Sequence, residues 1–385
     1  MKGLDVLKGV RIVEQGTFIT GPCTGMMLAD LGADVIKVES PDGDPYRAYQ
    51  GGNYSPHFQA YNRNKRSLAL DLKQPGDRTL FDTLIREADV FIQNFRPGTA
   101  DRLGAGAKRL QELNPKLVYC SISGFGADGP YVDRPSYDSV AQALSGFLSV
   151  VVDEDRPRFL GPALADAITG IYAAYGVLGA LFERSRTGHG RVVEVSMLEA
   201  MAHFAVEPFA AYFALGTVPR SADRPRLAQA HILRTKDGGL IAIHLSSLEK
   251  FWTGLIAAIE APQLATDPRF ATRLARIDNY DDLGRELDRL FTQRTVEEWV
   301  VRLGKNDVPF APINRVDAVV KDPQVQHLGI MVPIDNPQAA RQSVRPAVQF
   351  DGQRASSVRA APLINEHGAA IRAALSKSPS WPLES

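Results

Sequence analysis

Residues 161–199 read GPALADAITGIYAAYGVLGALFERSRTGHGRVVEVSMLE, and the predicted fold is organised around them. This stretch predicts a loop, a long helix, a glycine turn, a strand and a second helix. Apolar residues recur in the helix at alternating steps of three and four, a spacing typical of one buried helix face. The residues that we expect on this buried face are Ile168, Ile171, Tyr175, Leu178 and Phe182.

Asp166 lies just ahead of this face, where the first backbone N–H groups of a helix lack partners. By position alone, an aspartate there is an ordinary N-cap. The alternative is a reactive carboxylate, because the N-terminus of a helix stabilises negative charge and would keep an aspartate ionised as a nucleophile. Position alone leaves both interpretations open.

The N-terminal region predicts a βαβ unit that opens a parallel sheet. A short apolar strand at residues 10–13 leads into the loop GTFITG, residues 16–21, and a helix that ends at Gly32. A second strand follows at residues 34–39. The loop is not G-x-G-x-x-G, so its backbone cannot approach a pyrophosphate as a dinucleotide site requires. Further strands are predicted near residues 68–72, 89–93 and 117–123.

Basic residues flank the run NRNKRSLALDLKQPGDR, residues 62–78, whose alternating leucines are typical of a strand. Without further information we expect such side chains to form a solvated rim. They are Arg63, Lys65, Arg66 and Lys73.

The composition is that of an ordinary globular protein, with 385 residues, 44% of them hydrophobic and 23% charged. Lys plus Arg and Asp plus Glu number 44 each, so no basic excess predicts a nucleic-acid partner. Cys23 and Cys120 are far apart and not spaced as metal ligands. We see no signal peptide and no apolar run of membrane-spanning length, and we expect a cytoplasmic protein with no membrane partner.

Several motifs together resemble those of the class III CoA-transferases, the CaiB/BaiF-like family of formyl-CoA transferase and carnitine CoA-transferase. The resemblance covers almost the whole chain. The motifs are LKGVRIVEQG, NRNKRSLALDLK, QNFRPGTADRLG, GPALADAITG, RTGHGRVVEVSMLEAM and APLINEHG. The resemblance implies an α/β fold with a large Rossmann-like parallel-sheet domain and a smaller α/β domain, in an interlocked homodimer.

The expected domain boundaries follow from changes in composition and pattern. Residues 1–220 form the first part of the large CoA-binding domain, and residues 227–327 form the small domain, which begins with a hairpin. Within it, Thr295 and Glu298 predict a capping box. Residues 328–385 are expected to return to the large domain.

The resemblance also implies the chemistry. Asp166 would be the covalent nucleophile that moves CoA from an acyl-CoA to a small free carboxylic acid, with CoA as substrate and with no permanently bound cofactor or metal. Thr20 would offer its backbone N–H to an oxyanion. Some relatives carry a glutamine where this chain has Ile19. The residues implied to contact CoA or substrate are Phe18, Ile19, Thr20, Leu70, Lys73, Asn94, Phe95, Arg102, Tyr137 and Met197.

Two alternatives stay open. The related α-methylacyl-CoA racemases carry a histidine where this chain has Tyr137, and a tyrosine with a pKa near ~10 is a poor proton shuttle at neutral pH. A non-catalytic CoA-ester-binding protein is the other alternative. Substrate specificity is expected in loops near His57, Tyr61 and His231, and no glycine-rich loop precedes the small domain.

Overall fold

The computed structural model describes residues 4–159, 161–246, 248–334, 341–378 and 380–382. The chain forms two compact units of mixed α/β structure. Unit 1 comprises Met1–Leu148, Phe159–Val206 and Val325–Ser385, and unit 2 comprises Ser149–Arg158 and Glu207–Gln324. Each unit has its own hydrophobic core, as expected for a chain of this length.

Unit 1 contains a six-stranded sheet in the order β3-β2-β1-β4-β5-β6, and every neighbouring pair is parallel. The predicted parallel sheet is therefore confirmed. The strand order reverses between β1 and β4, and open α/β sheets bind ligands outside the carboxyl ends of the strands at such a point. The strands are β1 (Arg11–Gln15), β2 (Asp34–Glu39), β3 (Lys65–Ala69), β4 (Val90–Gln93), β5 (Val118–Ser123) and β6 (Val192–Ser196).

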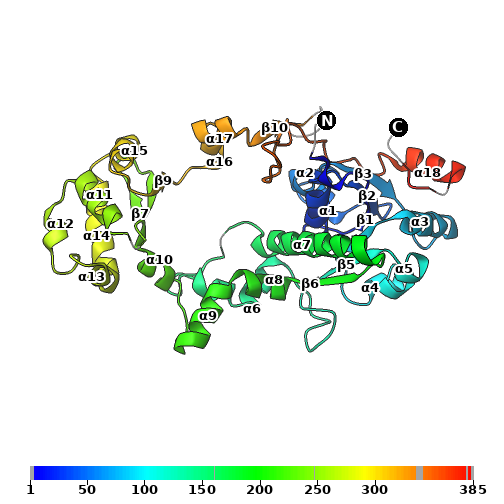
Figure 1. Ribbon diagram of the computed structural model, residues 1–385, viewed down its shortest axis with the longest axis horizontal. Coiled ribbons are helices and arrows are strands. Elements are labelled where there is room, and N and C mark those ends of the chain that lie inside the picture. The colour runs from blue at the N-terminus through cyan, green and yellow to red at the C-terminus, as the bar shows by residue number, and fades with distance from the viewer. Residues whose placement is uncertain (1–3, 160, 247, 335–340, 379, 383–385) are drawn as a thin grey trace. The chain divides into compact units, whose positions relative to one another are not determined.

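Helices cover both faces of this sheet (Figure 1). Alternate strand residues point to opposite faces, so each face builds a separate core. One core joins the sheet to α1 (Thr20–Asp30) and α7 (Leu164–Thr187). The other joins it to α3 (Pro75–Glu87), α5 (Ala107–Leu113) and α18 (Gly368–Lys377).

Helix α7 buries a different face from the predicted one. Only Ile168 of the predicted face is fully buried, whereas Ile171, Tyr175 and Phe182 are 50%, 74% and 67% exposed. Mostly small residues face the sheet instead, because α7 packs closely on α1 and on the strands, and Leu178 of the predicted face packs partly buried against this core. The buried residues are Ala165, Ile168, Thr169, Gly170, Ala173, Ala174, Val177 and Ala180.

The basic residues before and within β3 are buried, so the predicted solvated rim is wrong for three of the four. Lys65 lies in an ion pair with Glu14, Arg63 pairs with Asp30, and Arg66 pairs with Asp34. Only Lys73 is exposed. Opposite charges explain the burial, since a buried charge needs a partner.

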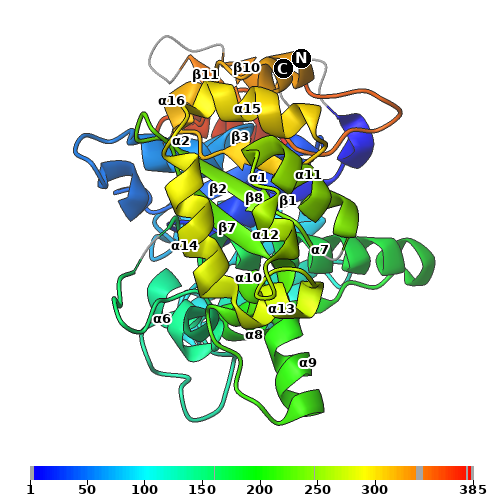
Figure 2. The same ribbon diagram turned by 90° about the vertical axis from the view of Figure 1, so that its left-hand side faces the viewer.

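Unit 2 is built on an antiparallel sheet in the order β7-β8-β9. Its strands are β7 (Ala230–Arg234), β8 (Leu240–His244) and β9 (Phe310–Pro312). Helices α11 (Glu249–Ile259), α14 (Tyr280–Phe291) and α15 (Val296–Lys305) pack on one face of the sheet around Trp252, Phe291 and Trp299 (Figure 2). The predicted capping box of Thr295 and Glu298 opens α15.

The C-terminal segment lies along the β3 edge of the large sheet. Trp381 donates its indole N–H to Asp34, and Arg372 pairs with Asp77. The remaining elements are short. They are α2 (Pro56–Asn62), α4 (Thr99–Arg102), α6 (Asp138–Leu144), α8 (Met197–Phe204), α9 (Val206–Leu215), α10 (Asp223–Ala228), α12 (Gln263–Thr266), α13 (Arg273–Asp278), α16 (Val316–Val319), α17 (Pro323–Leu328), β10 (Met331–Pro333), β11 (Gln342–Val344) and three 3₁₀ turns, η1 (Asp5–Leu7), η2 (Pro45–Ala48) and η3 (Phe147–Val150).

By length and composition, α7 could cross a membrane, which corrects the expectation that no apolar run is long enough. Its mean hydropathy reaches 1.4, but 44% of the same window is buried within the protein. A core helix passes this test as readily as a membrane helix, so the length and composition of α7 do not show whether it lies in a membrane.

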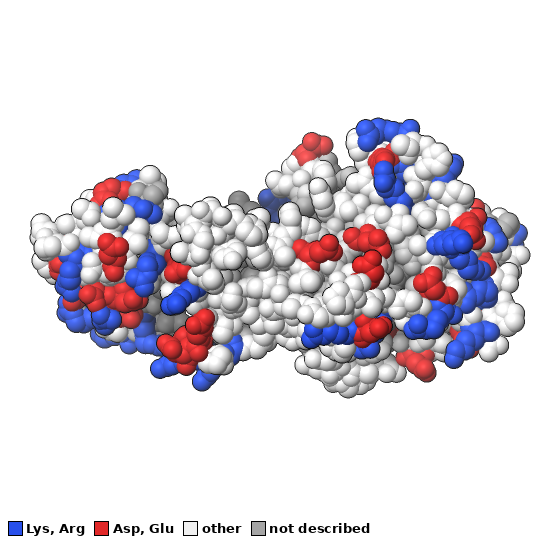
Figure 3. Space-filling model, turned by 90° about the horizontal axis from the view of Figure 1, so that it is seen from below, with Lys and Arg blue, Asp and Glu red and all other residues white. Residues whose placement is uncertain are grey.

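On the face drawn in Figure 3, acidic and basic side chains are interspersed.

Candidate active site

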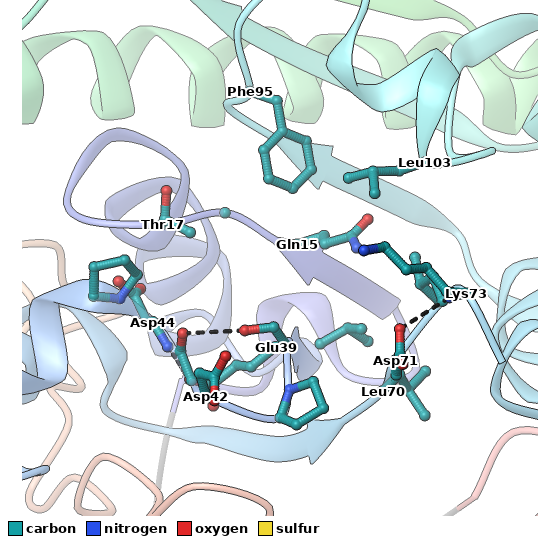
Figure 4. Close-up of a pocket in the computed structure, with 17 residues that line it drawn as sticks. Gln15, Thr17, Glu39, Asp42, Asp44, Leu70, Asp71, Lys73, Phe95 and Leu103 are labelled. Atoms are coloured by element: carbon teal, nitrogen blue, oxygen red, sulfur yellow. Dashed lines mark hydrogen bonds between the residues drawn. The ribbon is translucent and has the colours of Figure 1, made fainter.

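A cavity of about 550 Å³ lies where the strand order of the large sheet reverses. It is lined by the ends of β1 and β2 and by the segments that follow β3 and β4. Figure 4 shows Phe95 and Leu103 across this cavity from Asp42 and Leu70. We call it the crevice cavity.

A second cavity, of about 580 Å³, contains Asp166, and we call it the Asp166 cavity. It is lined by the loop between β1 and α1, by the loop after β4, by residues 122–126 and by residues 132–138. Thr17 and Phe95 line both cavities. The two cavities therefore adjoin at these two residues.

Gly170 brings the beginnings of α1 and α7 together. A Cβ atom on Gly170 would lie 2.8 Å from the Cβ atom of Cys23 and 3.1 Å from the carbonyl oxygen of Thr20. Only a glycine allows so close an approach. Asp166 precedes Gly170 by one helical turn and therefore lies on the same side of α7. The close crossing sets Asp166 and Thr20, the first residue of α1, in the same cavity.

Asp138 caps α7, and Asp166 does not. The Asp138 Oδ1 atom accepts the backbone N–H groups of Ala165 at 2.7 Å and of Asp166 at 3.3 Å. The N-cap residue itself, Ala163, has no side-chain acceptor. The N-cap interpretation of Asp166 is therefore wrong, and its carboxylate is left for another role.

Burial, and to a smaller extent the negative charge of Asp138, together raise the pKa of Asp166 to about 7. The sequence led us to expect the N-terminus of α7 to keep this carboxylate ionised. Desolvation and the like charge of Asp138 oppose this effect, so the carboxyl is only partly ionised at neutral pH. Asp166 is therefore poised to change its protonation state near neutral pH.

The loop before α1 is held by a side-chain amide. The Asn94 Oδ1 atom accepts the backbone N–H of Thr17 at 2.9 Å, and Nδ2 donates to the Thr17 carbonyl and to Thr20 Oγ1, both at 2.8 Å. Asn94 was expected to contact CoA. Its amide is bonded within the protein, and a contact with CoA stays a prediction.

The structure brings together nine of the ten residues implied to contact CoA or substrate. Leu70, Lys73 and Phe95 line the crevice cavity. Arg102 lines neither cavity, and its guanidinium donates to Thr99 Oγ1 at 2.7 Å. The residues lining the Asp166 cavity are Phe18, Ile19, Thr20, Asn94, Phe95, Tyr137 and Met197.

Tyr137 is 63% exposed, and its ring packs edge-on against Phe18 at a centroid distance of 6.4 Å. No histidine is among the residues that line the Asp166 cavity. An acid/base pair of the racemase type therefore has no support in this cavity.

The sequence did not single out several residues of the Asp166 cavity. Tyr46 and Tyr49 lie in and after η2, and Arg96 and Arg134 add two guanidinium groups to the lining. The Arg134 guanidinium stacks on Tyr131 at 4.4 Å. Two of these carried a signal, since Arg96 lies within the motif QNFRPGTADRLG, where the sequence predicts a surface charge, and Arg134 lies in the proline- and glycine-rich loop after β5.

Glu39, at the end of β2, is not available for a ribose. Its two carboxylate oxygens accept the Arg47 guanidinium at 2.7 and 2.8 Å, and Ser67 Oγ donates to it at 2.8 Å. This agrees with the sequence, which argued against a dinucleotide site. Among the described residues, no group of three or more His, Cys, Asp or Glu side chains is placed to hold a metal ion.

The three residues expected near specificity loops lie in different surroundings. His57 packs against Tyr46 and Tyr49 at centroid distances of 5.7 and 5.1 Å. Tyr61 packs in the cluster with Phe18 and Tyr46. His231 lies in unit 2, stacked on Tyr280 at 4.4 Å.

Comparison with known proteins gives a consistent result. The model of CoA-transferase family III matches residues 7–368. The chain is 34% identical to acetyl-CoA:oxalate CoA-transferase of Acetobacter aceti, covering 94% of each chain, and 33% identical to succinate–glutarate CoA-transferase of Agrobacterium fabrum, covering 96% of this chain and 95% of the other. The crystal structure of a CaiB/BaiF family protein from Brucella suis matches 95% of this chain and 98% of its own, with 36% identity and a TM-score of 0.85. The chain belongs to CoA-transferase family III.

Proposed function

We propose that the protein moves CoA from an acyl-CoA thioester to a free carboxylic acid and that Asp166 carries the covalent intermediates. The observation that supports this most directly is the position of one carboxylate. Asp166 lies in the first turn of α7, is not used as the helix cap, and lines a cavity of about 580 Å³. This geometry suits a nucleophile better than a structural residue.

The reaction conserves the thioester energy in four steps. An Asp166 oxygen attacks the donor thioester carbonyl, the C–S bond breaks, and CoA leaves as a thiolate. The thiolate attacks the aspartyl carbonyl of the mixed anhydride, which releases the donor acid and leaves an aspartyl-CoA thioester. The acceptor carboxylate attacks this thioester and expels the thiolate again. The thiolate then attacks the acceptor's acyl carbonyl, forming the new acyl-CoA and restoring Asp166.

The raised pKa of Asp166 supports this role. A carboxylate that burial has stripped of water is more basic, and in its ionised form it is a stronger nucleophile than a fully hydrated one. At neutral pH a substantial fraction is ionised without a separate base.

The Thr20 backbone N–H is our candidate donor for the oxyanion. Thr20 is the first residue of α1, and no acceptor for its N–H is found in the described part of the chain. The helix dipole adds positive potential at this end. Such a preorganised donor favours a developing negative charge. This role needs no side-chain amide at Ile19.

The crevice cavity would hold the nucleotide half of CoA. Lys73 is the exposed cation on its rim and suits a phosphate, while Leu70 and Phe95 offer apolar surface to the base or the pantetheine arm. Because Phe95 also lines the Asp166 cavity, the arm would pass this ring on its way to the carboxylate.

The acceptor is proposed to be a small dicarboxylic acid. The similar proteins named above are CoA-transferases whose names specify oxalate, succinate and glutarate. Arg96 and Arg134 line the Asp166 cavity and offer positive charge to a second carboxylate. Assays of acetyl-CoA and succinyl-CoA against oxalate, succinate, glutarate and monocarboxylic controls test this choice.

Hydroxylamine trapping tests the covalent role of Asp166. Incubation with a reactive acyl-CoA and hydroxylamine should convert this residue, and no other aspartate, to a hydroxamate that peptide mass spectrometry detects. Asp166→Ala should lose the adduct and the transfer activity while still binding CoA. Asp30→Asn, which changes a buried aspartate paired with Arg63, is the matched control and should retain both. Transfer by Asp166→Ala at the native rate would refute the proposal.

We also propose that the protein is a homodimer. The support is the outer face of α7, where Ile171, Tyr175 and Phe182 expose apolar surface, because monomeric proteins rarely expose large apolar patches. Light scattering after size exclusion should give about twice the chain mass of 42.0 kDa, and Tyr175→Glu should shift it toward the monomer. A native protein of monomer mass at micromolar concentration would contradict this proposal. The cytoplasmic location stays a prediction.

A further inference from the structure

The turn that leads into α1 has an unusual backbone conformation at Phe18. Its φ angle is +58°, in the left-handed region that residues with a side chain rarely adopt. Glycine adopts this region without strain, whereas an aromatic residue does so only when its surroundings hold it there. Phe18 lines the Asp166 cavity, so the strained residue lies at the site of the proposed chemistry.

A buried carboxylate holds this conformation. The Asp44 Oδ1 atom accepts the Phe18 backbone N–H at 3.1 Å and also the Tyr46 N–H at 2.9 Å. Asp44 is only 3% exposed. It lies 26 residues from Phe18 in the chain, so the contact is a product of the tertiary fold.

Lys37 ties the same carboxylate to the other side of the turn. Its ammonium lies 3.0 Å from the Asp44 Oδ2 atom and donates to the Gly16 carbonyl at 2.8 Å. The Lys37 side chain is fully buried. Lys37 and Asp44 therefore hydrogen-bond the turn at two backbone groups, the Gly16 carbonyl and the Phe18 N–H.

Stability alone gives little reason for this arrangement. A buried ion pair often stabilises a fold no better than packed apolar side chains, and a glycine at position 18 would remove the need to hold the turn. What the arrangement does fix is the path of the chain over the next two residues. That path leads directly to Thr20, the first residue of α1, which lines the cavity where Asp166 lies.

We propose that Asp44 is a positioning residue, which holds Phe18 in the left-handed conformation and thereby sets the oxyanion donor at the beginning of α1. This inference rests on the proposed function, since it concerns the geometry of that reaction. Asp44 itself contacts neither the thioester nor Asp166 in this assignment. Its effect belongs to the transition state and so appears in kcat more than in KM.

Asp44→Asn is the first test. A carboxylate accepts hydrogen bonds on both oxygens, whereas an amide accepts on one only, so asparagine cannot serve both Lys37 and the Phe18 N–H. We expect kcat per folded molecule to fall about 10- to 100-fold, as small misplacements of reacting groups do, while KM for the acyl-CoA changes less than about threefold. Folded protein is counted by circular dichroism, so a loss of stability does not enter kcat.

Asp30→Asn is the matched control. Asp30 is also buried and also pairs with a cation, Arg63, but it lies outside both cavities. We expect this variant to lose stability with kcat per folded molecule unchanged. An Asp44→Asn enzyme whose kcat stays within about threefold of the native value would overturn the inference.

A series at position 18 tests the conformation without disturbing the buried ions. Asparagine, leucine and valine all remove the aromatic ring, but asparagine adopts the left-handed region readily and the β-branched valine resists it. We therefore expect kcat to decrease in the order Phe18→Asn, Phe18→Leu, Phe18→Val. An order that follows apolar character instead, with asparagine lowest, would show that the turn conformation does not matter.

The outcomes separate this inference from the proposed function. Retained transfer in Asp166→Ala removes the covalent role of Asp166 whatever Asp44 does. Loss of transfer in Asp166→Ala with an unaffected Asp44→Asn leaves the proposed function intact and refutes the positioning role.

Discussion

Glu14 and Asp166 are two carboxylates of the same unit that burial treats in opposite ways. Glu14 is fully buried, and burial by itself would raise its pKa, but Lys37 and Lys65 hold that pKa below the usual range. Asp166 is less deeply buried, and within the described part of the chain the charge that shifts its pKa is that of Asp138, which adds to burial in raising the pKa to about 7. The difference teaches that burial sets the electrostatic cost and that the neighbouring charges decide whether a carboxylate is structural or reactive.

The network around Glu14 is compact. Lys37 Nζ lies 3.0 Å from one Glu14 oxygen, and Lys65 Nζ lies 2.5 Å from the other. Lys65 also donates to the carbonyls of Pro22 and Tyr61. With every charge paired, this cluster fixes α1 and α2 to the sheet and leaves no group free for chemistry.

The largest effect is expected when the structural carboxylate, Glu14, loses its charge. Glu14→Gln leaves Lys37 and Lys65 buried without their shared counter-charge, and we expect a loss of about 3–5 kcal/mol in the free energy of unfolding. Urea denaturation followed by circular dichroism measures this. The control is Glu207→Gln, at an exposed ion pair with Arg224, with an expected change below about 0.5 kcal/mol. A similar loss in both variants would contradict the view that the buried Glu14 stabilises the fold more than the exposed Glu207.

On the reactive side, the pH dependence of catalysis should follow Asp166. Only its ionised form attacks, so kcat/KM should rise about tenfold per pH unit below a midpoint near the pKa of about 7 and level off above it. Rates between pH 5 and pH 9 test this.

Asp138→Asn tests whether the charge of Asp138 contributes to this midpoint. It keeps an oxygen acceptor for the Ala165 N–H and removes the negative charge that raises the pKa of Asp166, so the midpoint should move to lower pH. A midpoint that does not move would mean that Asp138 does not influence the titrating group.

The contributions of Glu14 and Asp166 to the free energy of unfolding should also depend on pH with opposite signs. The raised pKa of Asp166 means that the folded state holds a proton which the unfolded state has released, so stability falls as pH rises from about 4 to about 7. Asp166→Asn should remove this fall. At pH 8 its free energy of unfolding should be about 1–2 kcal/mol larger than that of the native protein, and at pH 4 the two should be similar. Urea unfolding at both pH values measures it. A native protein that gains stability over this range relative to the variant would contradict the sign.

The smallest effect concerns a lysine outside the buried cluster. Lys73 is exposed at the rim of the crevice cavity, unlike Lys37 and Lys65. Lys73→Ala should raise KM for an acyl-CoA about two- to fivefold, the value of one screened charge, and leave the free energy of unfolding within about 0.5 kcal/mol. Acyl-pantetheine, which lacks the nucleotide, should show no change in KM. A fall in stability like that of Glu14→Gln would place Lys73 among the structural lysines.

Local patterns determined much of this protein. The strands and helices of the N-terminal βαβ unit, the glycine after α1, the hairpin of unit 2 and the Thr295 capping box all follow from spacing and turn residues over short distances. Motif resemblance named the family, Asp166 and nine other residues that line the two cavities. These features depend on neighbours in the sequence, so the sequence contains them.

Only the tertiary structure decided which faces and charges are buried. The apolar stripe of α7 predicted its buried face, yet the close crossing at Gly170 selects small residues for the core and turns Tyr175 and Phe182 outward. Likewise, Lys65 is buried because Glu14, 51 residues away, pairs with it, and Asp166 has a raised pKa because it is buried and because Asp138 is its neighbour in space. Burial and counter-charge arise from contacts between distant segments, so no local pattern specifies them.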